Sequence, residues 1–152
     1  MYENILVPTD ESDHALAAAE HACELASAHG ATVHVVYVVD TQTNWLTISK
    51  NEVRETAREI GEEMGTRALT DIERLGQEYD VPLVTELREG TPEEEILEYV
   101  ADNDIDLVVM GTHGRQGIKR RLVGSVTEHV VGESPVPVLT TSTTATQDAS
   151  DA

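Results

Sequence analysis

The 152-residue sequence contains no phenylalanine, one tryptophan (Trp45) and one cysteine (Cys23). A lone cysteine excludes a disulfide within the chain, and we expect Cys23 to be a small apolar residue on the inner face of a helix. With so few aromatic residues, the core must consist mainly of valine, leucine, isoleucine and alanine. No apolar run approaches the roughly 20 residues that span a bilayer, so the sequence predicts no association with a membrane.

Basic residues are also scarce, because ten Lys and Arg stand against 29 Asp and Glu and give a formal net charge of -19. This excess of negative charge opposes binding to nucleic acid and to an anionic membrane surface. A self-repelling acidic surface is typical of halophilic proteins, in which salt screens the repulsion, so we expect a high-salt cytoplasm. The first residues lack the basic and apolar regions of a signal peptide, which also favours a cytoplasmic location.

Short apolar runs alternate with longer amphipathic ones along the chain, and this pattern predicts an α/β fold with a parallel sheet and crossover helices. We expect one domain over residues 1–141 and a disordered polar tail over 142–152. The expected strands are 4–8, 31–39, 81–88, 106–110 and 136–140. The expected helices begin at Ser12 or Asp13, Ser49, Thr91 and Ser125, and end near Gly30, Tyr79, Asn103 and Glu133.

Local signals support these boundaries. The spacing of Leu16, Ala19, Cys23 and Ala26 predicts the buried face of the first helix. Ser49 and Glu52, and likewise Thr91 and Glu94, have the spacing of a capping box, with Pro92 at the first helical position. We expect Gly61 and Gly65 to weaken the second helix. Pro135 and Pro137 cannot donate to a ladder, which predicts an edge position for the last strand.

Four of the ten basic residues lie in one glycine-rich stretch from Met110 to Thr127, namely Arg115, Lys119, Arg120 and Arg121. The stretch follows the predicted strand 106–110 and leads into a predicted helix. Glycine lets backbone N–H groups approach a ligand, and a helix N-terminus presents unpaired donors and a positive dipole end to phosphate. An acidic protein that gathers its cations here is expected to bind an anion.

Two common phosphate-binding motifs are absent. The stretch contains no Gly-x-x-x-x-Gly-Lys-Ser/Thr, which excludes a P-loop. The turn after the first strand, Pro8 to Ser12, contains no glycine, which argues against a Rossmann dinucleotide site. What remains is Gly111-x-x-Gly114, nine further residues, and then Gly124-Ser125.

This spacing resembles the nucleotide-binding signature of the universal stress protein family. The resemblance covers about residues 1–141 and extends to the segments Ile5–Asp10, Val36–Asp40 and Pro135–Leu139. It implies an open five-stranded parallel sheet in the order 3-2-1-4-5 with helices on both faces, Rossmann-like and similar to the adenine nucleotide alpha hydrolase-like fold. Ligands of such sheets bind beyond the carboxyl ends of the strands where strand order reverses, which here is between the first and fourth strands.

The resemblance also implies roles for single residues. Asp10 would accept hydrogen bonds from ribose hydroxyls, Val38 and Met110 would line the adenine, and the glycine loop with the following helix would hold the phosphates. The expected ligand is ATP or another adenine nucleotide, with Mg²⁺ as a candidate bridge between the phosphates. No catalytic residue and no protein metal ligand is expected. The expected nucleotide-binding residues are Pro8, Thr9, Asp10, Val38, Met110, Gly111, His113, Gly114, Arg115, Gly124, Ser125, Val126 and Thr127.

Alternatives stay open from the residues alone. Asp10 could cap the following helix, the glycines could be ordinary turn residues, and His113 could serve loop conformation. His14 and His21 lie on similar faces of one helix, but a metal site needs more ligands.

The favoured function is that of a nucleotide-binding stress-response regulator, with an unknown downstream partner. A slow ATPase and a dimeric interaction module without nucleotide are the alternatives. A homodimer is expected in each case, through the apolar edge strand Val136–Leu139, which the resemblance pairs with its copy across a two-fold axis.

Overall fold

The computed structural model describes residues 1–41, 51–112 and 124–142. Its strands and helices alternate along the chain, as the sequence pattern predicts. The strands are β1 (Asn4–Thr9), β2 (Thr32–Asp40), β3 (Leu83–Gly90), β4 (Leu107–Gly111) and β5 (Val138–Thr141). The helices are α1 (Asp13–His29), α2 (Asn51–Tyr79), α3 (Pro92–Asp102) and α4 (Ser125–Glu133). Most of the predicted tail, residues 143–152, lies outside the described residues.

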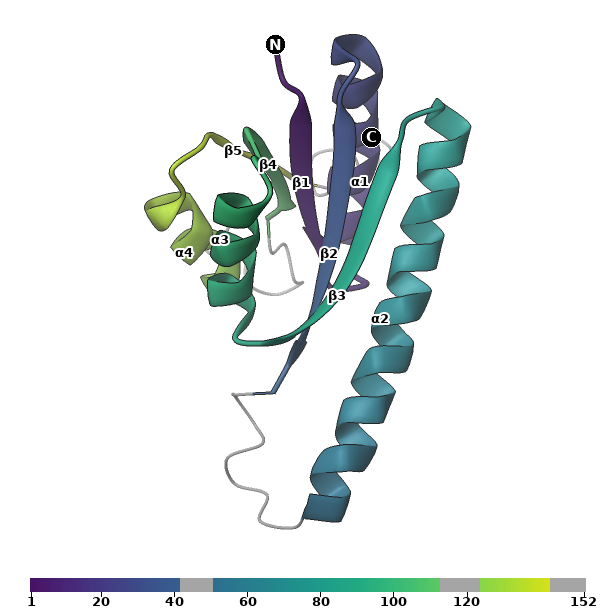
Figure 1. Ribbon diagram of the computed structural model, residues 1–152, viewed down its shortest axis with the longest axis vertical. Coiled ribbons are helices and arrows are strands. Elements are labelled where there is room, and N and C mark those ends of the chain that lie inside the picture. Colours follow the sequence, from purple (N-terminus) through teal and green to yellow (C-terminus); the bar gives the residue numbers. More distant parts are fainter. Residues whose placement is uncertain (42–50, 113–123, 143–152) are drawn as a thin grey trace, which may run out of the picture.

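Within the described residues, five parallel strands form one sheet in the order β3-β2-β1-β4-β5. Helices α1 and α2 cover one face of the sheet, and α3 and α4 cover the other (Figure 1). The predicted fold and strand order are therefore confirmed. No helix among residues 1–41, 51–112 and 124–142 combines the length and the apolar composition needed to cross a membrane.

Two apolar cores lie between the sheet and its helix layers. Alternate residues of each strand face opposite sides, because side chains of a β-strand alternate between the two faces. On β2, Val33 and Val35 contribute to the core under α1 and α2, while Val36 contributes to the core under α3 and α4. The predicted dominance of Val, Leu, Ile and Ala holds, with Tyr99 as the largest fully buried side chain.

Helix α1 has both predicted ends. The Ser12 side chain accepts a hydrogen bond from the Ala15 N–H at 3.1 Å, and Gly30 closes the helix in a left-handed conformation with φ 74°. Cys23 is fully buried, as expected. Leu16 is not, because 44% of it is exposed; the buried face of the helix is instead lined with alanine. These small side chains let α1 lie close to the strands.

Helix α2 runs unbroken through Gly61 and Gly65, and the structure gives both glycines a packing role that the sequence did not indicate. A Cβ atom at Gly65 would lie 2.6 Å from Tyr37 Cδ1 and 2.5 Å from Leu87 Cδ1. A Cβ at Gly61 would lie 2.8 Å from Val39 Cγ1. At both glycines the helix lies too close to the sheet to leave room for a larger side chain without a shift of its neighbours. Ser49, the predicted cap of this helix, lies outside the described residues.

Two further boundaries differ from the sequence prediction. Thr91 occupies the N-cap of α3 and Pro92 its first turn, but the Thr91 side chain makes no capping hydrogen bond, so the predicted capping box does not form. Strand β5 begins at Val138, after both prolines that were expected to flank or enter it. Its predicted edge position is confirmed by the strand order.

Candidate functional site

A cavity of about 300 Å³ opens at the carboxyl ends of β1, β2 and β4. The early turns of α1, α3 and α4 complete its walls. Eight of the thirteen predicted nucleotide-binding residues line it, namely Pro8, Thr9, Asp10, Val38, Met110, Gly111, Val126 and Thr127. The structure adds seven residues that the sequence did not single out for this site: Ser12, His14, Ala15, Val36, Asp40, Pro92 and Ile96.

The position of the cavity follows from how β1 and β4 pair. Their ladder joins Ile5 to Leu107 and Leu6 to Val108, and the register goes no further along these two described strands. Beyond that point β1 stays paired with β2 up to Thr9, while β4 stays paired with β5 up to Gly111. Strand β1 leads into α1 on one face of the sheet, and α4, the next described helix after β4, lies on the other face. The space between two such diverging segments is where open parallel sheets bind ligands.

One wall of the cavity is an apolar strip contributed by one face of β2. Because side chains alternate along a strand, Val36, Val38 and Asp40 share a face, and all three line the cavity. Ile96 of α3 and Met110 of β4 extend the strip. A flat, apolar strip with a carboxylate at its end suits a planar heterocycle attached to a hydroxylated group.

Asp10 is exposed at the mouth of the cavity, directly after β1. Its Oδ1 accepts a hydrogen bond from the Ser12 N–H at 3.0 Å, which makes a local turn, while Ser12 itself caps α1. The helix-cap alternative for Asp10 is thus wrong, since Ser12 performs that role. The turn holds the carboxylate in a fixed orientation, and a carboxylate has further acceptor sites for a ligand.

The residue after Asp10 has an uncommon backbone conformation. Glu11 has φ 72°, which a residue with a side chain adopts at a cost of about 1 kcal/mol or more. Its carboxylate pairs with the Arg67 guanidinium of α2 at 3.4 Å, and its N–H donates to Thr9 Oγ1 at 3.4 Å. These contacts hold the β1–α1 turn in place from outside the cavity.

Gly111 forms a corner of the cavity at the end of β4. A Cβ atom here would lie 2.5 Å from the His14 carbonyl oxygen and 2.9 Å from His14 Cβ, so only glycine lets β4 end against the first turn of α1. The Gly111 carbonyl accepts a hydrogen bond from Thr127 Oγ1 at 3.3 Å. Strand β4, α1 and α4 therefore meet at one peptide unit.

Helix α4 begins beside this corner with Gly124 as its N-cap. Val126 and Thr127 line the cavity, whereas Gly124 and Ser125 start the helix without lining it. The N–H groups of a first helical turn have no partner within the helix and carry the positive end of the dipole. The Thr127 hydroxyl, predicted to bind phosphate, donates its hydrogen bond to the Gly111 carbonyl instead. The donors that α4 offers to the cavity are therefore its first-turn backbone N–H groups.

The described part of the cavity is rich in negative charge, because both Asp10 and Asp40 line it. On the other face of the sheet, burial and then the charges of Glu11 and Asp10 raise the pKa of the Tyr37 phenol. Nowhere in residues 1–41, 51–112 and 124–142 do three or more metal-ligating side chains gather.

The remaining predicted site residues, His113, Gly114 and Arg115, lie outside the described residues, as do Lys119, Arg120 and Arg121. Of the residues that sequence analysis missed, Val36 and Asp40 could have been found by extending the two-residue period from Val38. Ser12, His14 and Ala15 lie within five residues of Asp10 in the sequence, and this closeness could have indicated that they line the same site. Pro92 and Ile96 carry no such signal, because only the docking of α3 brings them to the cavity.

Comparison with known proteins gives a consistent result. The model of the universal stress protein family matches residues 1–142. The chain is similar to universal stress protein MJ0531 of Methanocaldococcus jannaschii, with 38% identity over 139 residues that cover 91% of this chain and 81% of the relative. Among solved structures, it resembles universal stress protein UspA from Lactobacillus plantarum, with a TM-score of 0.78, 31% identity, and coverage of 91% and 97% of the two chains.

Two more distant solved structures share the fold and hold adenine nucleotides. One is a universal stress protein in complex with cAMP (TM-score 0.71, 24% identity, coverage 92% and 97%). The other is a universal stress protein family protein from Arabidopsis thaliana with AMP bound (TM-score 0.68, 17% identity, coverage 92% and 91%).

Proposed function

The chain belongs to the universal stress protein family, and from this premise we propose that its cavity binds an adenine nucleotide, with ATP as the favoured ligand. The observation that carries the proposal is the convergence in one cavity of an apolar strip, the Asp10 carboxylate and the first turn of α4 around Gly111. These are the three chemistries that a nucleotide presents to a protein: base, ribose and phosphate. The nucleotides held by the distant relatives support the same choice.

Each part of the ligand has matching groups. The adenine would lie against Val38 and Met110, its ribose hydroxyls would donate to Asp10, and its phosphates would accept hydrogen bonds from the first-turn N–H groups of α4. The cavity volume of about 300 Å³ is at the lower end for small-molecule sites, which are roughly 300–1,000 Å³. Mg²⁺ is the proposed bridge between the phosphates.

We propose that the protein acts as a homodimeric regulator in the cytoplasm. Nucleotide binding would change how strongly it binds its partner proteins. The open edge of β5 is the surface for the second copy. A formal charge of -19 favours a high-salt medium, because salt screens the repulsion within so acidic a surface.

Titration calorimetry of ATP into the purified protein, with Mg²⁺ and in molar KCl, tests the proposal through Asp10. Asp10→Asn keeps the Oδ1 acceptor for the Ser12 N–H and removes the charge. Hydrogen bonds to a charged group contribute about 1.5–3 kcal/mol, so we expect affinity to fall roughly 10- to 100-fold while the unfolding midpoint stays the same. Asp13→Asn, the same change three residues on and outside the cavity, should leave affinity unaltered.

Equal affinity in Asp10→Asn and the unmodified protein would contradict the assignment of Asp10. Complete absence of nucleotide binding by a folded protein that carries no co-purified nucleotide would favour the interaction-module alternative. Multiple-turnover hydrolysis that disappears with Asp10→Asn would instead identify an ATPase.

A further inference from the structure

His14 lies in the first turn of α1 and lines the cavity, half-buried, at the corner formed by Gly111. Its backbone lies so close to Gly111 that no Cβ fits between them, with 2.5 Å from that position to the His14 carbonyl oxygen. Thr127 reaches the same peptide from α4 through its hydrogen bond to the Gly111 carbonyl at 3.3 Å. His14 and the α4 N-terminus therefore flank the same corner.

The part of the apolar strip that Val36 and Val38 form lies on β2, and the corner lies at the end of β4. Strand β1 separates these two strands in the sheet. Neighbouring strands are about 4.8 Å apart, so β2 and β4 are separated by roughly 10 Å. A base resting on Val36 and Val38 would thus direct the other end of an extended nucleotide toward His14 and Thr127.

The charges around the cavity give His14 a particular importance. Asp10 and Asp40 both repel a polyanion, and among the described lining residues His14 alone can carry a positive charge. A neutral imidazole offers one N–H donor and an imidazolium offers two, and both can bond a phosphate oxygen. Hydrogen bonds to an ionised group are about twice as strong as those between neutral groups.

We propose that His14 binds the phosphate groups of the ligand and makes the cavity discriminate phosphorylated adenine compounds from adenosine. The inference rests on the proposed function and adds to it the residue that sets ligand preference. The base and ribose contacts are common to adenosine and ATP, so they cannot provide this discrimination. The phosphate contacts provide it, and His14 contributes to them beside the first-turn N–H groups of α4.

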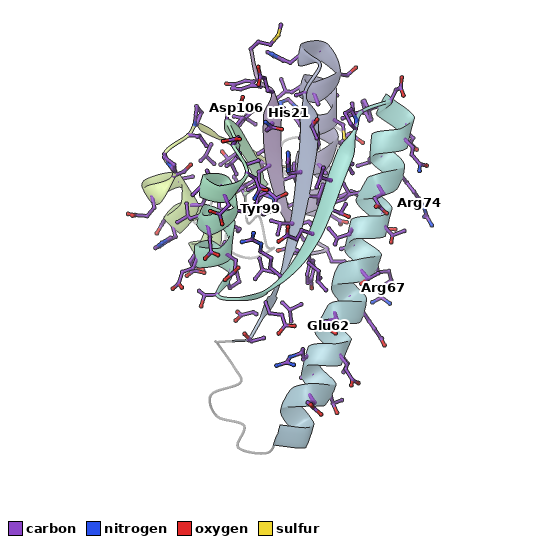
Figure 2. All side chains as sticks on the ribbon, viewed as in Figure 1. His21, Glu62, Arg67, Arg74, Tyr99 and Asp106 are labelled. Carbon is purple, nitrogen blue, oxygen red and sulfur yellow. The ribbon has the colours of Figure 1, made fainter. Side chains whose placement is uncertain are left out.

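The experiment measures the affinities of ATP, AMP and adenosine for the unmodified protein and for His14→Ala and His14→Gln. We expect His14→Ala to weaken ATP binding about tenfold or more and to change adenosine binding by less than about twofold, with AMP between them. His14→Gln retains an N–H donor and should recover part of the lost ATP affinity. The control is His21→Ala, two turns further along α1 (Figure 2) and not among the residues that line the cavity, which should alter none of the affinities.

The outcomes separate this inference from the one that it rests on. If His14→Ala weakens ATP and adenosine by the same factor, His14 is only a wall of the cavity and the inference is overturned, while the proposed function stands. If His14→Ala changes neither affinity, the inference is also overturned. If the unmodified protein binds none of the three ligands, the proposed function fails first. The unfolding midpoint of each variant shows whether a loss of affinity comes from misfolding. If His14→Ala is misfolded, the affinities of His14→Gln are compared with those of the unmodified protein instead.

Discussion

At the scale of single residues, glycines in this chain have opposite roles that depend on what surrounds them. Gly111 is pressed against the His14 backbone, whereas a Cβ at Gly132 in α4 would have no atom within 4 Å. Neither position has a backbone angle that excludes other residues, so space alone distinguishes them. The two glycines therefore form a matched pair for measuring what the close approach at the cavity contributes.

We predict that Gly111→Ala destabilises the fold by about 1–3 kcal/mol, because the added methyl group must displace the backbone of α1. Gly132→Ala should stabilise it by about 0.5–1 kcal/mol, since alanine is the better helix former and meets no neighbour. Urea unfolding followed by circular dichroism gives both values. If both substitutions change the free energy of unfolding equally, the backbone at His14 moves aside for the added methyl group at no measurable cost, which would contradict the prediction.

At the scale of secondary-structure elements, a buried chain of polar groups links β1, β2 and α3. His34 Nδ1 is 2.8 Å from the Tyr99 hydroxyl, and His34 Nε2 is 3.1 Å from Asn4 Oδ1. Asn4 Oδ1 can only accept, so Nε2 carries the proton and Nδ1 accepts from Tyr99. Figure 2 shows Tyr99 between α3 and the sheet, where the Arg88 guanidinium lies 5.0 Å from its ring centre. This chain ties the helix that carries Pro92 and Ile96 to the strands beneath it.

Burial lowers the pKa of His34 in the folded protein, and this makes stability depend on pH. The unfolded chain takes up a proton near pH 6.5, while folded His34 stays neutral to a lower pH, so stability is lost as pH falls through that interval. We predict that His34→Gln is less stable than the unmodified protein at pH 8 and that this difference narrows by pH 5. Urea midpoints at both pH values measure it, and parallel pH profiles for the two proteins would contradict the assignment.

The sequence predicted the elements well because they depend on local patterns. Alternation of apolar runs, Ser12 as a cap and Gly30 as a stop are all encoded within a few residues. Leu16 was wrongly placed on the buried face, and the packing role of Gly61 and Gly65 was missed, because their surroundings come from other elements. In the same way, Asp10 and Gly111 could be assigned to one site, but the α3 wall could not, because no local signal reports how a helix docks.

At the scale of the whole molecule, the edge strand β5 is the surface through which the proposed homodimer would form. The Pro137 and Thr141 carbonyls accept hydrogen bonds from β4, at Val108 N and Thr112 N. Backbone groups alternate sides along a strand, so those of Val138 and Thr140 are directed toward the open edge. The proposed homodimer would use them.

We predict that Thr140→Pro converts the dimer to a monomer, because proline removes an outward N–H donor from the edge. Thr140→Ala, which keeps that donor, should remain dimeric. Sedimentation velocity in molar KCl distinguishes the two species. A monomeric unmodified protein would contradict the proposed pairing, and a dimeric Thr140→Pro would place the interface elsewhere.

The walls of the cavity come from chain segments as far apart as Pro8 and Thr127, and no single helix or strand contains them all. The unfolded chain has no such site, so a molecule that binds in the cavity stabilises the folded state. A free ligand concentration 100 times Kd raises the free energy of unfolding by about 2.7 kcal/mol. The lifetime of each copy against proteolysis would then rise and fall with nucleotide supply. The abundance of the protein would follow the energy state of the cell without any separate control of its synthesis.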